Sequence, residues 1–356
     1  MFMYSLLFIL PAIPLLFPHF MRIRGLDDDS YKRASIFAFF FVLLFMCAFH
    51  AKSVGNDSAS YLMMFKRFSR WSLSRVLTYK EPAFALLCKG ISMLTDQYQW
   101  LVIIVSLISV LPIMTLYVDE VEYPMTTIAL FVFTSNFYML FSGMRQAIAI
   151  SLGIFAYQMV KRKQLAPFLL IVVLAFLFHR SALMLVFMYP LYHMRLMKRS
   201  LFVVVPVMLL IFVCNRQIFG FLQGIIQDYE HIGNRESNSF MMLLLLIAFS
   251  ALSYVIPDDN QLDADAIGLR NFLLMTTAVQ MFVPLNFLVM RMGYYYLIFM
   301  PITVPKMLQA YSVKWRQVAV AAHYVLLLYF TLHFFLSAPA ANTLNIFPYR
   351  FFWEMV

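Results

Sequence analysis

Arg145 stands between two long apolar runs, where only Ser142, Gly143 and Gln146 accompany it. A guanidinium kept at such a junction is a candidate functional group, because a charge within apolar sequence is costly. At the start of a helix, the guanidinium and the free backbone N–H groups would point to one region and suit a phosphate or pyrophosphate. Position alone leaves a second interpretation open, an arginine that anchors a helix end at the membrane surface.

Two further breaks in apolar sequence carry similar groups. His179 and Arg180 interrupt the run 169–190, as at a broken helix that borders a cavity. A histidine satisfied at the interface and an anchoring arginine are the alternatives there. Arg291 precedes three tyrosines at 294–296, which alone are typical of an aromatic belt, and the arginine favours a binding role.

The elements that must position these residues are membrane-spanning helices. The chain has 356 residues, of which 63% are hydrophobic and 12% charged, with a mean hydropathy of +0.80. Such a balance lies outside that of soluble domains, and the apolar runs have the length of spanning helices. We predict one all-α, polytopic membrane domain over 1–356, with about ten to twelve transmembrane helices. The predicted spans are 3–20, 34–50, 99–118, 124–141, 145–160, 165–178, 181–194, 200–214, 239–256, 270–289, 293–312 and 317–336.

Short basic clusters between the spans set the sidedness, because cytoplasmic loops carry an excess of Lys and Arg. The clusters at 161–163, 195–199 and 314–316 share one parity and are predicted to be cytoplasmic, as is the acidic loop 257–269. The connections of the opposite parity are predicted to face outward. They are the long segment 51–98, the loop 215–238 and the turns at Arg145, His179 and Arg291.

The outward segment 51–98 opens with Gly55, Asn56 and Asp57, which are turn-forming residues. Such a turn would hold a carboxylate near the membrane surface, although a solvated turn without function fits the same residues. The segment is basic, and since long loops cross the membrane largely regardless of charge, its basic residues indicate binding.

Two short helices are expected within this segment. Aromatic residues recur at helical spacing from Tyr61 to Trp71 with basic residues between them, as in an interfacial helix on anionic head groups. A second helix is expected from Glu81 and Pro82, because proline favours the first helical position. If the second helix crossed the bilayer, the first two spans would change side.

The net charge of +10 is spread between spans, so orientation and anionic lipid explain it better than nucleic acid does. The sequence contains no P-loop, no GxSxG and no HExxH, and its three cysteines lack metal-ligand spacing. We therefore expect neither a cofactor nor a metal.

Four short motifs together resemble the EpsG family of bacterial polysaccharide-biosynthesis proteins, which look like Wzy-type polymerases of O-antigen, capsule and exopolysaccharide. The family's G-x-D-x-x-x-Y is similar to 55–61, its E-P to 81–82, its R-Q-x-[IL]-A to 145–149 and its F-H-x-[ST] to 178–181. The resemblance implies a glycosyltransferase of GT-C-like architecture with a cavity facing outward. It would join oligosaccharide repeat units carried on undecaprenyl pyrophosphate, at the outer side of the bacterial cytoplasmic (inner) membrane.

The resemblance also implies roles for single residues. Arg145, helped by Arg180 and Arg291, would stabilise the leaving pyrophosphate. Asp57 or His179 would accept the proton of the acceptor hydroxyl, and the sequence does not choose between them. The further substrate contacts implied are Gly55, Tyr61, Glu81, Gln146 and Tyr295.

The implied partners are the lipid-linked oligosaccharide, the bilayer, a chain-length regulator and a flippase. The rival function is a transporter or flippase for lipid-linked oligosaccharide, whose arginines would line a cavity near the middle of the bilayer. In this sequence the charges instead gather at one set of outer turns.

Overall fold

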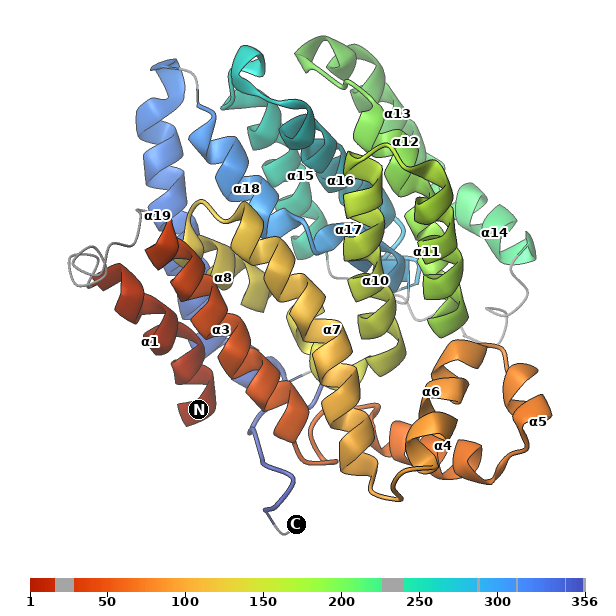
Figure 1. Cartoon of the computed structure of the whole chain (residues 1–356). Helices are drawn as coiled ribbons and strands as arrows, with labels where there is room; N and C mark the ends of the chain where they lie inside the picture. The colour runs from red at the N-terminus through yellow and green to blue at the C-terminus, as the bar shows by residue number, and fades with distance from the viewer. Residues whose placement is uncertain (17–28, 226–239, 287–288, 312, 343, 355–356) are drawn as a thin grey trace. The chain divides into compact units, whose positions relative to one another are not determined.

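The computed structural model describes residues 1–16, 29–225, 240–286, 289–311, 313–342 and 344–354 (Figure 1). The part 226–238 of the predicted second outer loop lies outside these residues. Among the described residues the chain is helical, with only two isolated β-bridges, His50 with Phe351 and Pro257 with Tyr311. The all-α prediction is therefore confirmed.

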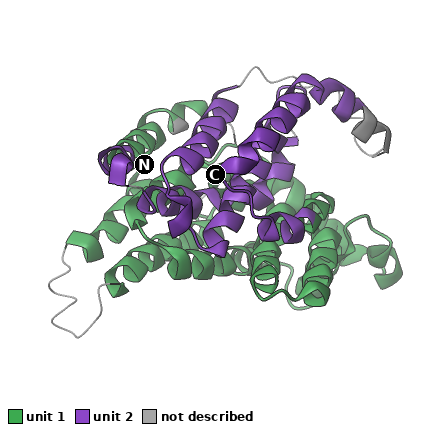
Figure 2. Ribbon diagram, turned by 90° about the horizontal axis from the view of Figure 1, so that it is seen from above, with its two compact units in different colours: residues 1–186, 323–356 green, residues 187–322 purple. Residues whose placement is uncertain are grey.

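The chain divides into two compact units, residues 1–186 with 323–356 and residues 187–322 (Figure 2). The single membrane domain stays a prediction. The helices of unit 1 are α1 (Phe2–Leu16), α3 (Ser30–Phe49), α4 (Ser58–Arg70), α5 (Leu73–Leu77), α6 (Pro82–Ser92), α7 (Tyr98–Glu120), α8 (Pro124–Phe133), α9 (Ser135–Ser142), α10 (Met144–Lys161), α11 (Leu165–Phe178), the 3-10 helix η1 (Arg180–Phe187), α19 (Arg316–Leu336, from 323 on) and α20 (Ala338–Ala341).

Unit 2 has the same all-helical character in its described part. Its helices are α12 (Met188–His193), η2 (Lys198–Ser200), α13 (Leu201–Val213), α14 (Asn215–Ile225), α15 (Met241–Val255), η4 (Asp259–Gln261), α16 (Ala264–Gln280), α17 (Met290–Leu297), α18 (Met300–Gln309) and η6 (Val313–Trp315).

Three of the described helical stretches are continuous, long and apolar enough to cross a membrane: α3, α7 and Val313–Ala341. The pair α8 and α9 passes the same test together but bends by 61° at Thr134. The predicted span 124–141 is thus broken, because Thr134 is extended (ψ 152°) between two helices. Likewise, the span predicted over 181–194 consists of the 3-10 helix η1 followed by α12.

The segment between α3 and α7 folds as three short helices, α4, α5 and α6. Helix α6 has 11 residues, and at 1.5 Å per residue its length is only about 16 Å, roughly half of a hydrocarbon core of about 30 Å. It is therefore too short to cross the membrane. Among the described residues, the segment between α3 and α7 thus contains no helix long enough to cross a membrane.

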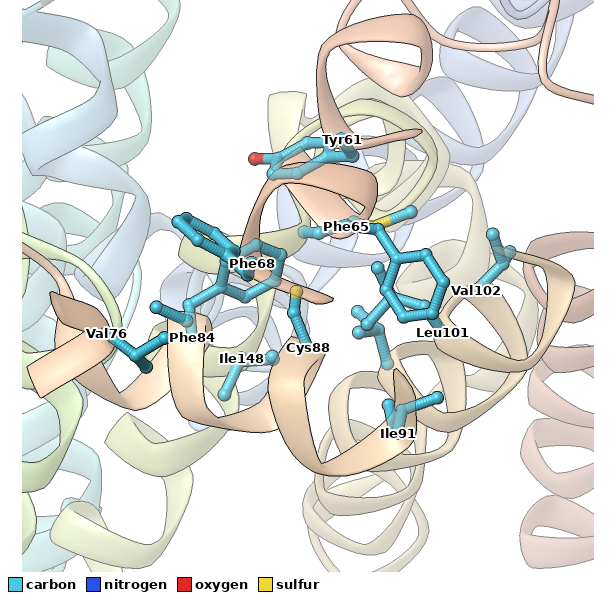
Figure 3. Packing of buried hydrophobic residues seen from close by; sticks show 13 residues of the cluster. Tyr61, Phe65, Phe68, Val76, Phe84, Cys88, Ile91, Leu101, Val102 and Ile148 are labelled. Atoms are coloured by element: carbon cyan, nitrogen blue, oxygen red, sulfur yellow. The ribbon is translucent and has the colours of Figure 1, made fainter. Parts of the chain in front are cut away.

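Within unit 1, α3 packs against α1 and α7, and α10 packs against α7 and α11. Figure 1 shows α3 and α7 running side by side, with α4, α5 and α6 gathered at one end of α7. The buried aromatic face of α4 joins α6, α7 and α10 in one apolar cluster (Figure 3). Each Å² of apolar surface that is buried contributes about 25 cal/mol of stabilisation. This cluster is therefore the main attachment of α4 and α6 to the rest of unit 1.

Helix α16 begins earlier than predicted. Asp263 caps it by accepting a hydrogen bond from the Ala266 amide at 2.7 Å, which shortens the predicted acidic loop 257–269. Arg270, predicted at the helix start, therefore lies inside the helix and is fully buried. Its guanidinium lies 3.3 Å from the Asp259 carboxylate and donates to backbone carbonyls, so the buried charge is paired.

Candidate functional site

Glu81 is placed by the start of α6. The residue before a proline is driven out of the helical region, and Glu81 has non-helical dihedral angles (φ −132°, ψ 74°) ahead of Pro82. Its side chain makes no capping hydrogen bond to its own helix. The carboxylate is therefore available to helices from elsewhere in unit 1.

The Glu81 carboxylate joins three donors that are distant in sequence. Its Oε2 forms an ion pair with Nη1 of Arg145, at the start of α10. Its Oε1 lies 2.8 Å from Nδ1 of His179 and accepts a bond of 3.3 Å from the Arg180 amide, at the end of α11. Because Glu81 is only 3% exposed, these contacts hold a nearly dry carboxylate.

Arg145 is the second residue of α10, which follows a tight turn at Gly143. A Cβ at Gly143 would lie 1.9 Å from Cε of Met139, so the turn requires a glycine or a displaced methionine. The Arg145 amide lies 3.5 Å from the Tyr61 hydroxyl, and its guanidinium lies 5.7 Å from the centre of that ring. Tyr61 and Glu81 together hold the arginine between α4 and α6.

The Arg145 guanidinium has more N–H donors than its contact with Glu81 uses. Its Nε is buried and has no hydrogen-bond partner among the described residues. A guanidinium carries five N–H donors, and a phosphate group can accept several of them at once. The Arg145 side chain is 24% exposed, so part of it can contact an anion while its Nη1 stays with Glu81.

His179 ends α11, where the backbone turns extended (φ −156°, ψ 121°) and the histidine amide bonds the Ala175 carbonyl at 2.9 Å. The next residues form η1 instead of a new α-helix. Arg180 also donates from Nε to the Lys80 carbonyl at 3.4 Å. The break at 179–180 is thus attached to the residues just before α6.

The electrostatics of the cluster keep Glu81 ionised. Burial alone would raise the pKa of Glu81, but the hydrogen bond from His179, the charge of Arg145 and the Arg180 amide lower it to about 2. An ionised carboxylate only accepts hydrogen bonds, so Nδ1 of His179 carries the proton. In the neutral imidazole Nε2 then keeps its lone pair. Burial raises the pKa of Tyr61, whose hydroxyl therefore stays protonated at neutral pH.

The turn at 55–57 lies against the end of α9. Gly55 has φ 85°, and a Cβ there would lie 2.3 Å from the Phe141 carbonyl oxygen. The Asp57 amide donates to Oγ of Ser142 at 3.3 Å. Asp57 begins α4 one helical turn before Tyr61, and its side chain makes no capping bond. The turn therefore lies next to the residues that lead into Arg145.

The spacing of the aromatic residues predicted that this face of α4 lies on lipid head groups. In the structure the face packs inside the protein instead. Tyr61, Phe65 and Phe68 are buried in the apolar cluster of Figure 3. The sequence pattern could not distinguish a lipid surface from the neighbouring α6 and α7. The exposed face instead carries Lys66, Arg67 and Arg70.

The remaining predicted residues lie in α10 and in unit 2. Gln146 is buried in α10, directly after Arg145. Arg291 and Tyr295 lie in α17 of unit 2, where Tyr295 is buried. Their roles stay predictions.

The structure thus brings together Glu81, Arg145, His179 and Arg180, with Tyr61 beside them, and one family model matches the chain over this whole region. The match is to the EpsG family and covers residues 33–351. The chain belongs to the EpsG family. Members of this family are Wzy-type polymerases, so the chain is a membrane protein of polysaccharide polymerisation. Searches of curated proteins and of solved structures find no significant match.

The structure also shows contacts of Glu81 that the sequence did not predict. Glu81 was predicted only as a substrate contact, whereas three groups of the protein itself surround its carboxylate. The E-P pair signals a helix start, but nothing local to it identifies the partners.

Proposed function

We propose that this EpsG-family polymerase transfers a growing glycan from undecaprenyl pyrophosphate to a hydroxyl of the next lipid-linked repeat unit, on the outer side of the cytoplasmic membrane. The observation that carries the proposal is the shared carboxylate of Glu81, which links an arginine to a histidine. Stabilisation of a leaving anion and removal of a proton are the two tasks of this reaction.

Arg145 is assigned to the leaving pyrophosphate. When the anomeric C–O bond breaks, the pyrophosphate departs with the bonding electron pair and gains negative charge. A preorganised cation stabilises that charge most when water is excluded. Arg145 is held by Glu81 and Tyr61, and its side chain is largely but not fully buried. Arg180 is assigned as its helper.

His179 is assigned as the general base. As the acceptor oxygen bonds to the anomeric carbon, its proton passes to Nε2 of His179, and the imidazolium that forms is stabilised by Glu81. The arrangement follows the logic of a carboxylate that orients a histidine and fixes its tautomer. Glu81 is then a positioning residue, although it was first predicted as a substrate contact.

Asp57 is assigned to acceptor binding. It lies one turn before Tyr61 on α4 and bonds through its backbone to Ser142. Its carboxylate would accept hydrogen bonds from sugar hydroxyl groups. Under this assignment Asp57→Asn weakens acceptor binding, whereas His179→Asn slows the chemical step.

The test uses lipid-linked repeat units extracted from a strain that lacks the polymerase, incubated with purified protein in lipid nanodiscs. Wild type is expected to give a ladder of longer glycans. Arg145→Ala should lower the rate by about 100-fold or more. Arg145→Lys should restore little of the activity, because the planar guanidinium of arginine binds phosphate through several N–H groups at once, whereas the lysine ammonium acts as a point charge. Arg162→Ala is the matched control, since Arg162 lies at the opposite end of α10.

Folding is checked by the unfolding temperature of each variant. A ladder from well-folded Arg145→Ala at the wild-type rate would overturn the assignment of Arg145. Absence of a ladder with wild type, together with movement of lipid-linked units across vesicle membranes, would replace the polymerase by the rival transporter.

A further inference from the structure

The described C-terminal residues lie along the chain from Phe49 to Asn56. The Ala51 amide donates to the Arg350 carbonyl at 2.9 Å, and the Phe352 amide donates to the Phe49 carbonyl at 3.0 Å. The Tyr349 hydroxyl donates to the Met46 carbonyl at 3.0 Å. These bonds attach residues 344–352 to the end of α3 and to the loop that follows it.

The same segment reaches the turn at 55–57. The Gly55 amide donates to the Asn345 carbonyl at 3.0 Å, and the Asn56 amide donates to the Leu344 carbonyl at 3.1 Å. The side chain of Asn345 donates to the Ser53 carbonyl at 3.0 Å. The third amide of the turn, that of Asp57, is used by Ser142. The C-terminal segment therefore supplies the acceptors for two of the turn's three backbone amides, those of Gly55 and Asn56.

The segment is itself anchored in the core. Ile346 is fully buried and its carbonyl accepts a hydrogen bond from the Tyr4 hydroxyl. The Phe347 ring lies 4.4 Å from the Tyr4 ring, and the Phe347 amide donates to the Asn342 side chain at 3.0 Å. The backbone carbonyls of Leu344 and Asn345 are thus held in place by the buried residues that follow them.

Asn345 suits this position for two reasons. Its φ is +53°, in the left-handed region, which asparagine adopts more readily than most other residues with a side chain. Its side-chain amide also bonds back to Ser53. Asn345 thus sets the backbone direction of the C-terminal segment and also bonds this segment to the loop that follows α3.

We propose that Asn345 is a positioning residue of the polymerase, which holds the turn at 55–57 against the end of α9 and so places Asp57 beside the residues that lead into Arg145. This inference rests on the proposed function of Asp57 and Arg145. Asn345 acts through the turn, and its support comes from a part of the chain almost 300 residues away.

The test measures the turn directly. Hydrogen exchange, followed by mass spectrometry on the full-length protein in nanodiscs, reports on peptides that contain Gly55 and Asn56. Asn345→Asp removes the donor to Ser53 while it keeps a residue that tolerates positive φ, and exchange should become about five- to tenfold faster, as expected for one lost hydrogen bond. Asn345→Ala also disfavours the backbone conformation and should show a larger effect. Glu354→Gln, an exposed change in the same segment, is the control.

The second readout is the ladder assay with extracted lipid-linked units. Asn345→Asp should raise KM for the lipid-linked unit severalfold, with a smaller effect on kcat and an unfolding temperature close to that of wild type. A merely structural role would lower stability without this separation of KM from kcat.

The possible failures are distinguishable. Unchanged exchange at Gly55 and Asn56 in both variants would overturn the proposal, whatever the activity. Faster exchange with unchanged KM would also overturn it, while the roles of Arg145 and His179 would stand. If wild type itself gives no ladder, the proposed function fails, and so does the positioning role that depends on it.

Discussion

Oε1 of Glu81 lies 2.8 Å from Nδ1 of His179, although 98 residues separate them in the chain. The contact fixes which nitrogen carries the proton, because an ionised carboxylate can only accept. The other oxygen of the same carboxylate holds Arg145. One buried group therefore orients the His179 ring and holds the Arg145 guanidinium.

Replacing His179 by asparagine separates the two functions of its ring. The asparagine side chain would keep an N–H near the position of Nδ1 and could still donate to Glu81, but it has no counterpart of Nε2. We expect kcat for ladder formation to fall by about 100- to 10,000-fold, the usual range for a general base, with the unfolding temperature little changed. Stopped-time ladder assays on purified protein measure the rate.

His179→Gln is the matched comparison, because glutamine reaches toward the Nε2 position and loses the contact at Nδ1. It should lower both the rate and the stability. Wild-type kcat in a well-folded His179→Asn protein would exclude His179 as the base and return that role to Asp57.

The charge of Glu81 should appear in the pH dependence of stability. The pKa of Glu81 is lowered to about 2 in the folded protein from an ordinary value of 4.5. A lowered pKa contributes stability that is fully present above the unfolded value and is lost as pH falls through the folded value. The contribution should therefore be constant above about pH 5 and decline between about pH 4.5 and 2.

Unfolding temperatures of wild type and Glu81→Gln, measured from pH 7 down to pH 2.5, check this expectation. The difference between the two proteins should be large at neutral pH and shrink below pH 4.5. Asp96→Asn, at an exposed carboxylate in the segment 51–98, is the control for the removal of a carboxylate. A difference that is already lost by pH 6 would contradict the assigned contacts.

Gly55 and Gly90 form a matched pair of glycines. Gly55→Ala would place a Cβ 2.3 Å from the Phe141 carbonyl oxygen and at φ 85°. We expect it to destabilise unit 1 by at least about 1–2 kcal/mol and to reduce activity through the turn at 55–57. Gly90→Ala meets nothing within 4 Å in α6 and should be neutral or gain up to about 1 kcal/mol.

Chemical unfolding of the two variants beside wild type measures the difference. Equal stability of Gly55→Ala and Gly90→Ala would show that the turn accommodates a side chain. The close approach of 55–57 to α9 would then not be required.

The exposed face of α4 should bind anionic lipid. Between 58 and 80 the chain carries five basic residues and no acidic residue, and α4 lies in the segment that connects the spanning helices α3 and α7. Each basic residue near an anionic surface contributes about 1 kcal/mol. Replacing Lys66, Arg67 and Arg70 by glutamine should therefore weaken phosphatidylglycerol binding by about tenfold or more.

Native mass spectrometry of protein titrated with phosphatidylglycerol or phosphatidylcholine measures the effect. Arg162→Gln with Lys163→Gln, at the far end of α10, is the control. Equal phosphatidylglycerol binding by the triple variant and wild type would mean that this face has another partner.

Sequence reasoning predicted most where the signal is local. The residue limits predicted for 165–178 coincide with those of α11, Leu165–Phe178, because a continuous apolar run is bounded by polar residues on both sides; this helix is shorter than the candidate spans. The start of α6 was predicted from Pro82, whose ring favours the first helical position. The break at Thr134 was not predicted, since neither glycine nor proline marks it.

The site was predicted as separate residues and not as a cluster. Arg145 and His179 were each identified as costly polar groups within apolar sequence. Their meeting at Glu81 depends on how α6, α10 and α11 pack, which no local pattern records. The C-terminal segment was missed for a related reason, because its bonds to 51–56 use mainly backbone groups.

The shared carboxylate also has a consequence for biogenesis. Glu81 is synthesised 64 residues before Arg145 and 98 residues before His179. At about 5–20 residues per second, the ribosome needs roughly 5–20 seconds to make the second partner after the glutamate. Until Arg145 is made the carboxylate lacks both side-chain partners, and burying it alone would be costly. The start of α6 should therefore become buried only after α10 and α11 have been made and have supplied the partners of Glu81.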